Sequence, residues 1–281
     1  MIILEGFPKK PYDLIHVHSV PDFEVFATLV PKLMGSKIIL DIHDLVPEFY
    51  ASKFSENYES FLFRSLTAIE KACKIADDAM QGIAVHLKAG VSEKQVAWNL
   101  ESMLRQHGSD TLPFEIIVAS GPNAALPHAQ PSDRLINEGD PVIIDLGARC
   151  AGYCSDITRT FFIGDETEKY NTVYNIVLGA QMTALSVIEK GMSARSADGL
   201  VRGMIVNAGY GEFFGHGLGH GVGLETHELP RIGALSDDIL QDGMVFTIEP
   251  GIYLPGWGGV RIEDTVTITG GKLRTLTQAA K

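Results

Sequence analysis

Four acidic residues and one histidine have the types and spacing of a site for two metal ions. Asp145 and Asp156 lie in VIIDLGARCAGYCSDITRTFF, His220 lies in FFGHGLGHGVGLETHELP, and Glu249 and Glu263 lie in MVFTIEPGIYLPGWGGVRIEDTVTIT. Each carboxylate is set in an otherwise apolar, β-branched stretch, and an ionised group taken out of water is strongly unfavourable unless a counter-charge compensates it. A pair of metal cations is the simplest compensation.

The chemistry of these five side chains indicates which metal they would hold. One imidazole with four carboxylates is a hard, oxygen-rich set, which suits Mn²⁺, with Co²⁺ or Zn²⁺ as alternatives; a structural zinc ion would prefer thiolates and imidazoles. Two ions bridged by carboxylates, about 3.5–4 Å apart, can bind and ionise a water molecule at neutral pH. We therefore expect two divalent metal ions and a metal-bridging hydroxide.

The elements that carry these residues are predicted to occur twice. The first set is a helix over residues 67–90, a helix from a capping box at Ser92 to about His107, and an antiparallel hairpin over residues 141–163. The second set is a helix opened by Asp165 and running to about Glu189, a helix capped by Ser193 and running to about Ala208, and a hairpin over residues 244–269.

A single acid in a strand usually faces solvent. Two acids in each of two matching hairpins instead predict one central cleft between two related halves.

Residues 1–65 have a different pattern from the rest of the chain. YDLIHVHS is typical of a strand, DFEVFATLVPKLMG of an amphipathic helix, and SKIILDIHD of a second strand. Together they predict a short βαβ Rossmann-like segment preceding a catalytic domain over residues 66–281. The fold class expected for the whole chain is α/β, with α+β character in the larger domain.

Composition excludes several classes of protein. The 281 residues carry a formal net charge of −12 and no cluster of Lys or Arg, which argues against nucleic-acid binding. No apolar run reaches the ~18 residues of a membrane span, and no signal peptide is recognised. The three cysteines, Cys73, Cys150 and Cys154, are too few for a disulfide framework and are expected to be free thiols. We expect a cytoplasmic protein with no nucleic-acid or membrane partner.

Four segments carry a resemblance to a known family. IDLGARCAGYCSDITRTF, GHGLGHGVGLETHELP, GMVFTIEPGIY and GGVRIEDTVTI resemble the motifs of the pita-bread (M24) metallopeptidases, which include methionine aminopeptidase, aminopeptidase P and Xaa-Pro dipeptidase (prolidase). The resemblance runs from about Leu66 to the C-terminus. It implies a pita-bread (creatinase/aminopeptidase-like) catalytic domain, and GGVRIEDT is similar to the Xaa-Pro branch rather than to methionine aminopeptidases.

The resemblance also implies roles for individual residues. It makes Asp156 a bidentate or bridging metal ligand and Glu263 a bridging one. It makes Glu249 both a ligand and the group that carries the proton of the attacking water. The remaining two ligands it implies are Asp145 and His220.

Residues outside the ligand set also receive roles from the resemblance. His128, in SGPNAALPHA, and His227, in the HELP segment, match the two histidines that contact the substrate and the tetrahedral intermediate. Arg261 resembles the arginine that supports the site beside the last ligand. His216 has two open interpretations, a supporting group next to the ligands or a packed histidine.

The function implied is hydrolysis of a peptide bond near a free N-terminus, most often an Xaa-Pro bond, in a peptide or dipeptide substrate. The alternatives are a broader or methionine-type aminopeptidase and, in another class, a non-catalytic pita-bread module that binds peptides. Xaa-Pro enzymes carry a longer N-terminal domain than this chain, so its preference for dipeptides and its oligomeric state, a homodimer being one option, stay open.

A second resemblance concerns the N-terminal segment alone. YDLIHVHSVPDFEVFATLVPKLMGSKIILDIHDLVPEFYASKF resembles a fragment of the N-terminal domain of family 4 glycosyltransferases of the GT-B fold. Those enzymes hold the sugar nucleotide largely through a second domain that this chain does not contain. Glycosyl transfer is therefore not expected.

Overall fold

The structure is a computed structural model that describes residues 14–18, 37–41 and 58–281. It divides into two compact units, residues 1–63 and 64–281. In the first unit, β1 (Leu14–His18) and β2 (Lys37–Asp41) pair in parallel, as expected for two strands of a βαβ unit. The helix predicted between them lies outside the described residues, and the assignment of residues 1–65 as a separate Rossmann-like segment stays a prediction. Within the described ranges, no helix is long and apolar enough to cross a membrane.

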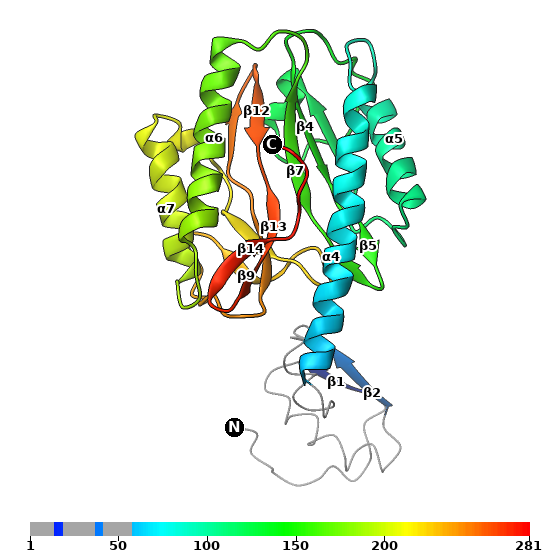
Figure 1. The fold of residues 1–281 in the computed structure, drawn as a ribbon, viewed down its shortest axis with the longest axis vertical. Helices are drawn as coiled ribbons and strands as arrows, with labels where there is room; N and C mark the ends of the chain where they lie inside the picture. The colour runs from blue at the N-terminus through cyan, green and yellow to red at the C-terminus, as the bar shows by residue number, and fades with distance from the viewer. Residues whose placement is uncertain (1–13, 19–36, 42–57) are drawn as a thin grey trace. The chain divides into compact units, whose positions relative to one another are not determined.

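The second unit contains two similar halves (Figure 1). The elements of the first half are α4 (Tyr58–Ile83), α5 (Glu93–Gln106), β3 (Ile117–Ser120), β4 (Pro141–Leu146), β5 (Arg149–Cys150), β6 (Tyr153–Cys154) and β7 (Ile157–Phe162). Those of the second half are α6 (Glu168–Val187), α7 (Ala194–Asn207), β8 (Gly219–Gly221), β9 (Glu228–Ile232), β10 (Val245–Ile248), β11 (Gly251–Leu254), β12 (Gly258–Arg261), β13 (Asp264–Thr269) and β14 (Lys272–Thr275). Short 3₁₀ turns include η1 (Ala84–His86), η2 (Gly121–Ala125) and η3 (Gly211–Phe213).

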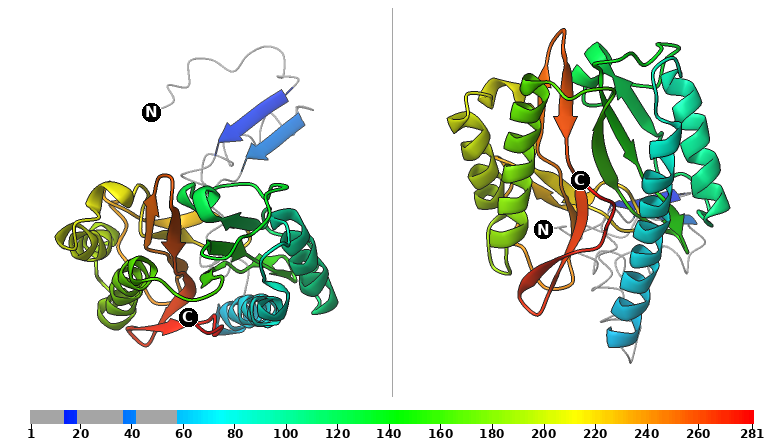
Figure 2. Two further views of the ribbon diagram at one scale, coloured as in Figure 1. Left: turned by 90° about the horizontal axis from the view of Figure 1, so that it is seen from above. Right: turned by 45° about the horizontal axis from the view of Figure 1, so that its top comes forward.

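The strand pairing repeats the same plan in both halves. In the first half, β4 pairs antiparallel with β7 and β5 pairs with β6; in the second half, β10 pairs antiparallel with β13 and β11 pairs with β12. The complete sheets have the orders β3-β4-β7 and β14-β13-β10-β8-β9. Figure 2 shows α4 and α5 beside the strands of the first half and α6 and α7 beside those of the second. The predicted repeat of two helices and a hairpin is confirmed, but its first helix ends at Ile83 and not at residue 90.

Helix starts follow from their capping residues. The hydroxyls of Ser92 and Ser193 each accept a hydrogen bond from the backbone N–H three residues ahead, at 3.2 and 3.1 Å, so both predicted caps are confirmed. The start predicted for α6 is wrong. Thr167, and not Asp165, caps this helix by accepting from a backbone N–H at 3.2 Å. Both residues can cap a helix, and the sequence alone does not say which of the two stands where the chain turns.

Each half has a hydrophobic core of its own. In the first, the buried faces of α4 and α5, with Met80 and Leu100, pack on strand residues such as Ile144. In the second, α6 and α7 cover the sheet around Phe246. The junction between the halves holds a smaller cluster, in which Tyr253 packs with Ile117 and Ile143, together with polar side chains.

Threonine hydroxyls join the two halves along β7, β12 and β13. Thr160 donates from Oγ1 to the carbonyl oxygen of Arg261 at 2.8 Å and accepts from its backbone N–H at 3.0 Å. Thr265 donates to the carbonyl oxygen of Asp156 at 2.7 Å. Buried peptide groups at this junction are thus satisfied by side chains where the two sheets do not share a continuous ladder.

Glycines in β8 let its backbone lie close to the backbone of neighbouring segments. A Cβ atom at Gly219 would meet the carbonyl oxygen of Thr247, and one at Gly221 would meet that of Leu229. The alternating glycines of this segment therefore serve close packing of strands.

We expect Gly219→Ala to lower the free energy of unfolding by about 1–3 kcal/mol, because a methyl group there displaces the backbone of β10. The matched control is Gly199→Ala on the exposed side of α7, where a Cβ meets no atom within 4 Å. That change should stabilise the protein by up to about 1 kcal/mol. Urea unfolding of both variants measures the difference, and equal midpoints would contradict the close-packing account.

Candidate metal centre

The five predicted ligand residues lie where strands end or are interrupted. Asp145 is on β4, Asp156 lies between β6 and β7, His220 is the middle residue of β8, Glu249 lies between β10 and β11, and Glu263 lies between β12 and β13. The two aspartates come from the first half and the other three residues from the second. The site is therefore built across the junction of the halves.

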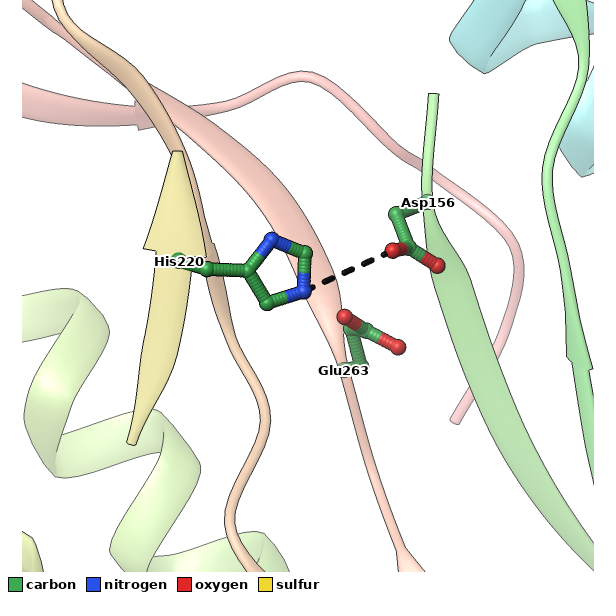
Figure 3. Close-up of side chains that lie close together, drawn as sticks. All are labelled: Asp156, His220 and Glu263. Carbon is green, nitrogen blue, oxygen red and sulfur yellow. Dashed lines mark ion pairs between the residues drawn. The ribbon is translucent and has the colours of Figure 1, made fainter. Parts of the chain in front are cut away.

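Three of the five residues form the centre of the site. Asp156, His220 and Glu263 each offer one ligand atom, and these atoms all lie within 4.8 Å of one another. Figure 3 shows the three side chains directed toward a common point. His220 Nε2 is 3.7 Å from Asp156 Oδ2. The side chains of Asp156 and Glu263 are buried, with the residues only 4% and 2% exposed. Such a group of buried ligand atoms can hold a cation.

The other two acids lie next to this group. Glu249 Oε1 is 3.4 Å from His220 Nε2. Within the part of the chain that the structure describes, the Oδ1 atoms of Asp145 and Asp156 are buried and have no hydrogen-bond donor. Buried acceptors without donors are rare in proteins, and a metal ion satisfies them directly. The donor set and these two oxygens both fit divalent cations.

Burial and mutual repulsion shift the titration of these groups. Burial, followed by repulsion from neighbouring carboxylates, raises the pKa of Asp156 and of Glu263 well above the usual range. Burial likewise raises the pKa of Glu249 to about 8. Burial lowers the pKa of His220, which favours the neutral imidazole that can bind a metal. Without a cation, the site cannot hold all its acids ionised.

Arg261 connects two of the acids. Its guanidinium is buried, with Nη2 2.7 Å from Asp145 Oδ2. Its Nε donates to Thr158 Oγ1 at 3.1 Å, and Thr158 in turn donates to Glu263 Oε2 at 2.6 Å. One cation therefore orients an acid from each half.

Tyr253 extends this network and was missed by the sequence reasoning. Its hydroxyl accepts from Arg261 Nη1 at 3.0 Å and lies 2.9 Å from His216 Nε2. Burial lowers the pKa of His216 to about 4, so this imidazole is neutral. The sequence feature that could have revealed Tyr253 is its partner across the β11–β12 hairpin, Gly259. Because glycine has no side chain, it leaves room for the aromatic ring.

His128 and His227 are both exposed, and His227 lies beside the ligand cluster. The rings of His227 and His220 are 4.0 Å apart and inclined by 33°. Burial, the neighbouring His220 and, more weakly, His128 lower the pKa of His227. The two exposed histidines can therefore reach a molecule that approaches the cluster.

The chain matches the model of metallopeptidase family M24 over residues 67–270. It is 45% identical to an Xaa-Pro dipeptidase of Pyrococcus horikoshii over 78% of this chain and 62% of that protein. It is 47% identical to an uncharacterized peptidase of Bacillus subtilis over 76% of this chain and 60% of that protein. The chain thus spans about three fifths of the length of these relatives.

Solved structures have the same fold. The prolidase from Pyrococcus furiosus superposes with a TM-score of 0.81 at 39% identity, covering 97% of this chain and 78% of that chain. The X-Pro aminopeptidase from Thermotoga maritima gives a TM-score of 0.80 at 36% identity, covering 95% and 74%. The predicted pita-bread fold is confirmed. The family match begins at residue 67 and lends no support to the glycosyltransferase resemblance of residues 1–65. From Thr67 to Gly270, the motifs, fold and cluster agree, and the chain belongs to metallopeptidase family M24.

Proposed function

We propose that the chain hydrolyses a peptide bond near a free N-terminus, most readily an Xaa-Pro bond, with two divalent metal ions. The observation that carries the proposal is the buried cluster of Asp156, His220 and Glu263, extended by Asp145 and Glu249. The relatives named Xaa-Pro dipeptidase, from two Pyrococcus species, support the choice of bond. The oxygen-rich donor set favours Mn²⁺ over a thiolate-preferring metal.

The five residues hold the metals in this proposal, and the metal pair supplies an activated water at neutral pH. Glu249 is proposed to accept the proton of the attacking water, because its carboxylate lies within the ligand cluster, with Oε1 3.4 Å from His220 Nε2. Arg261 keeps Asp145 in place through their 2.7 Å ion pair. The remaining groups act on the substrate.

His128 and His227 are proposed to bind the peptide and the oxyanion that forms when its carbonyl is attacked. Both are exposed; His227 lies against His220, and His128 follows Pro127, whose carbonyl oxygen accepts from Arg261. An N–H donor aimed at a developing oxyanion stabilises the transition state. Proline lacks a backbone N–H and has a fixed φ, so an Xaa-Pro substrate is selected by the shape of its ring. His216 and Arg261 support the site through their contacts with the Tyr253 hydroxyl, and Arg261 also through its ion pair with Asp145.

A cytoplasmic location is also part of the proposal. The three cysteines are free and buried, as is typical of proteins in a reducing compartment.

Loading with Mn²⁺ should give more than one ion per chain, and excess chelator should abolish peptide cleavage. The reason is that the five residues bury negative charge that only cations can balance. Metal analysis should be combined with assays on Xaa-Pro dipeptides, longer Xaa-Pro peptides and peptides that begin with Met. Full activity in excess chelator would overturn the metal assignment, and preference for the Met peptides would move the chain to the methionine-type alternative.

His227→Ala and His128→Ala should each lower kcat by on the order of 10²–10³-fold, the effect typical of losing one oxyanion donor. Their metal content should stay at the wild-type level. His107→Ala, which removes an exposed histidine at the end of α5, is the matched control and should leave kcat unchanged. A histidine variant with wild-type kcat on its best substrate would exclude the role given to that residue.

The stabilisation produced by metal should grow as pH rises from about 5 to about 8. Asp156, Glu249 and Glu263 have pKa values raised in the folded protein, so the metal-free fold is favoured below the unfolded pKa values. The metal-free fold loses that stability as the pH rises through the pKa values that these three acids have in the folded protein. Metal binding keeps the acids ionised and removes the loss. Thermal unfolding with Mn²⁺ and with chelator tests this, and a difference in Tm that does not change with pH would contradict it.

A further inference from the structure

Glu93 is a buried acid that lies outside the metal cluster. It is the first residue of α5 and has no exposed surface. An ionised carboxylate can be buried at such a position only if donors surround it. Its partners come from one segment of the chain, the loop that carries His128.

The two ends of this loop meet at the carboxylate. Oε1 of Glu93 accepts from the backbone N–H and the hydroxyl of Ser120, both at 2.7 Å. Oε2 accepts from the backbone N–H of Ser132 at 3.0 Å and from its hydroxyl at 2.6 Å. Asn123 Nδ2 donates to both oxygens at 3.1 Å. One side chain therefore closes the loop of residues 121–131.

The middle of the loop rests on β12. A Cβ at Gly259 would meet the carbonyl oxygen of Ala124, so loop and strand are in direct backbone contact. The Arg261 Nη1 atom donates to the carbonyl oxygen of Pro127 at 3.1 Å. That residue directly precedes His128. The loop is thus fixed at its ends by Glu93 and in its middle by the arginine that also holds Asp145.

We propose that Glu93 is a positioning residue that sets the place of His128 relative to the metal centre by closing the 121–131 loop. The proposal rests on the proposed function, because His128 is the group through which it acts. Misplacing a substrate-binding group by about 1 Å can lower the rate on the order of 10²-fold. Glu93 touches neither the metal ligands nor the substrate, so its effect must pass through the loop.

Glu93→Gln tests the proposal because each carboxylate oxygen accepts a backbone N–H. An amide has only one acceptor oxygen, so in either orientation its NH₂ group faces the N–H of Ser120 or that of Ser132. The control is Glu101→Gln on the same helix, where the acid pairs with Arg105 and not with the loop. The milder variant Ser132→Ala removes the hydroxyl contact of 2.6 Å, along with the bonds that this hydroxyl accepts from Asn123 Nδ2 and the backbone N–H of Arg134. It keeps the backbone N–H bond to Glu93, so it should act in the same direction with a smaller effect.

The first readout does not depend on activity. Hydrogen exchange of the peptide that spans residues 121–132 should become faster in Glu93→Gln, and in Ser132→Ala to a smaller extent, with or without metal. It should be unchanged in Glu101→Gln. Unchanged exchange in both loop variants would overturn the proposal, even if the wild-type chain cleaved no peptide and the proposed function itself had failed.

The second readout is a double-mutant cycle. In the wild-type background, Glu93→Gln should lower kcat/KM by about 10–100-fold with unchanged metal content. In the His128→Ala background, the same change should have less than about a threefold effect, because the group that it displaces is already absent. Equal effects in the two backgrounds, or loss of metal, would show that Glu93 does not act through His128.

Discussion

The burial of negative charge at one point is the constraint on which the rest of this structure depends. Asp156 and Glu263 are almost completely buried and lie close enough to repel each other and their neighbours. Proteins hold such groups only with cations or with many hydrogen bonds. The strands end at these residues, the glycines of β8 bring His220 close to β10, and threonines satisfy the backbone around them. These features are explained together by the need to gather acids around metal ions.

Arg261 supplies the fixed positive charge in this arrangement. It binds one acid directly and another through the Thr158 hydroxyl, and it also holds the carbonyl oxygen of Pro127. Acids of the cluster and the loop that carries His128 are therefore tied to the same guanidinium. Lysine could not replace it, because a single ammonium group cannot direct donors to several partners in fixed directions.

The sequence identifies the parts of this site that are local. Acids in apolar strands, repeated in two hairpins, predict four of the five proposed ligand residues, and the structure brings ligand atoms of Asp156, His220 and Glu263 close together. Serine caps marked two helix starts correctly. Tyr253 and Glu93 were missed because their partners are distant in sequence, and a buried acid at the first turn of a helix resembles an ordinary solvated one. Only the folded chain shows which loop such an acid faces.

The separate core of each half has a consequence for how the molecule holds together. Asp145 and Asp156 lie in the first half and the other three residues in the second, so an ion bound by both groups would form a reversible cross-link between the halves. Such a link stabilises the folded state according to metal concentration, since the unfolded chain does not present the assembled site. The concentration of free metal around the protein would then set the resistance of the two halves to coming apart.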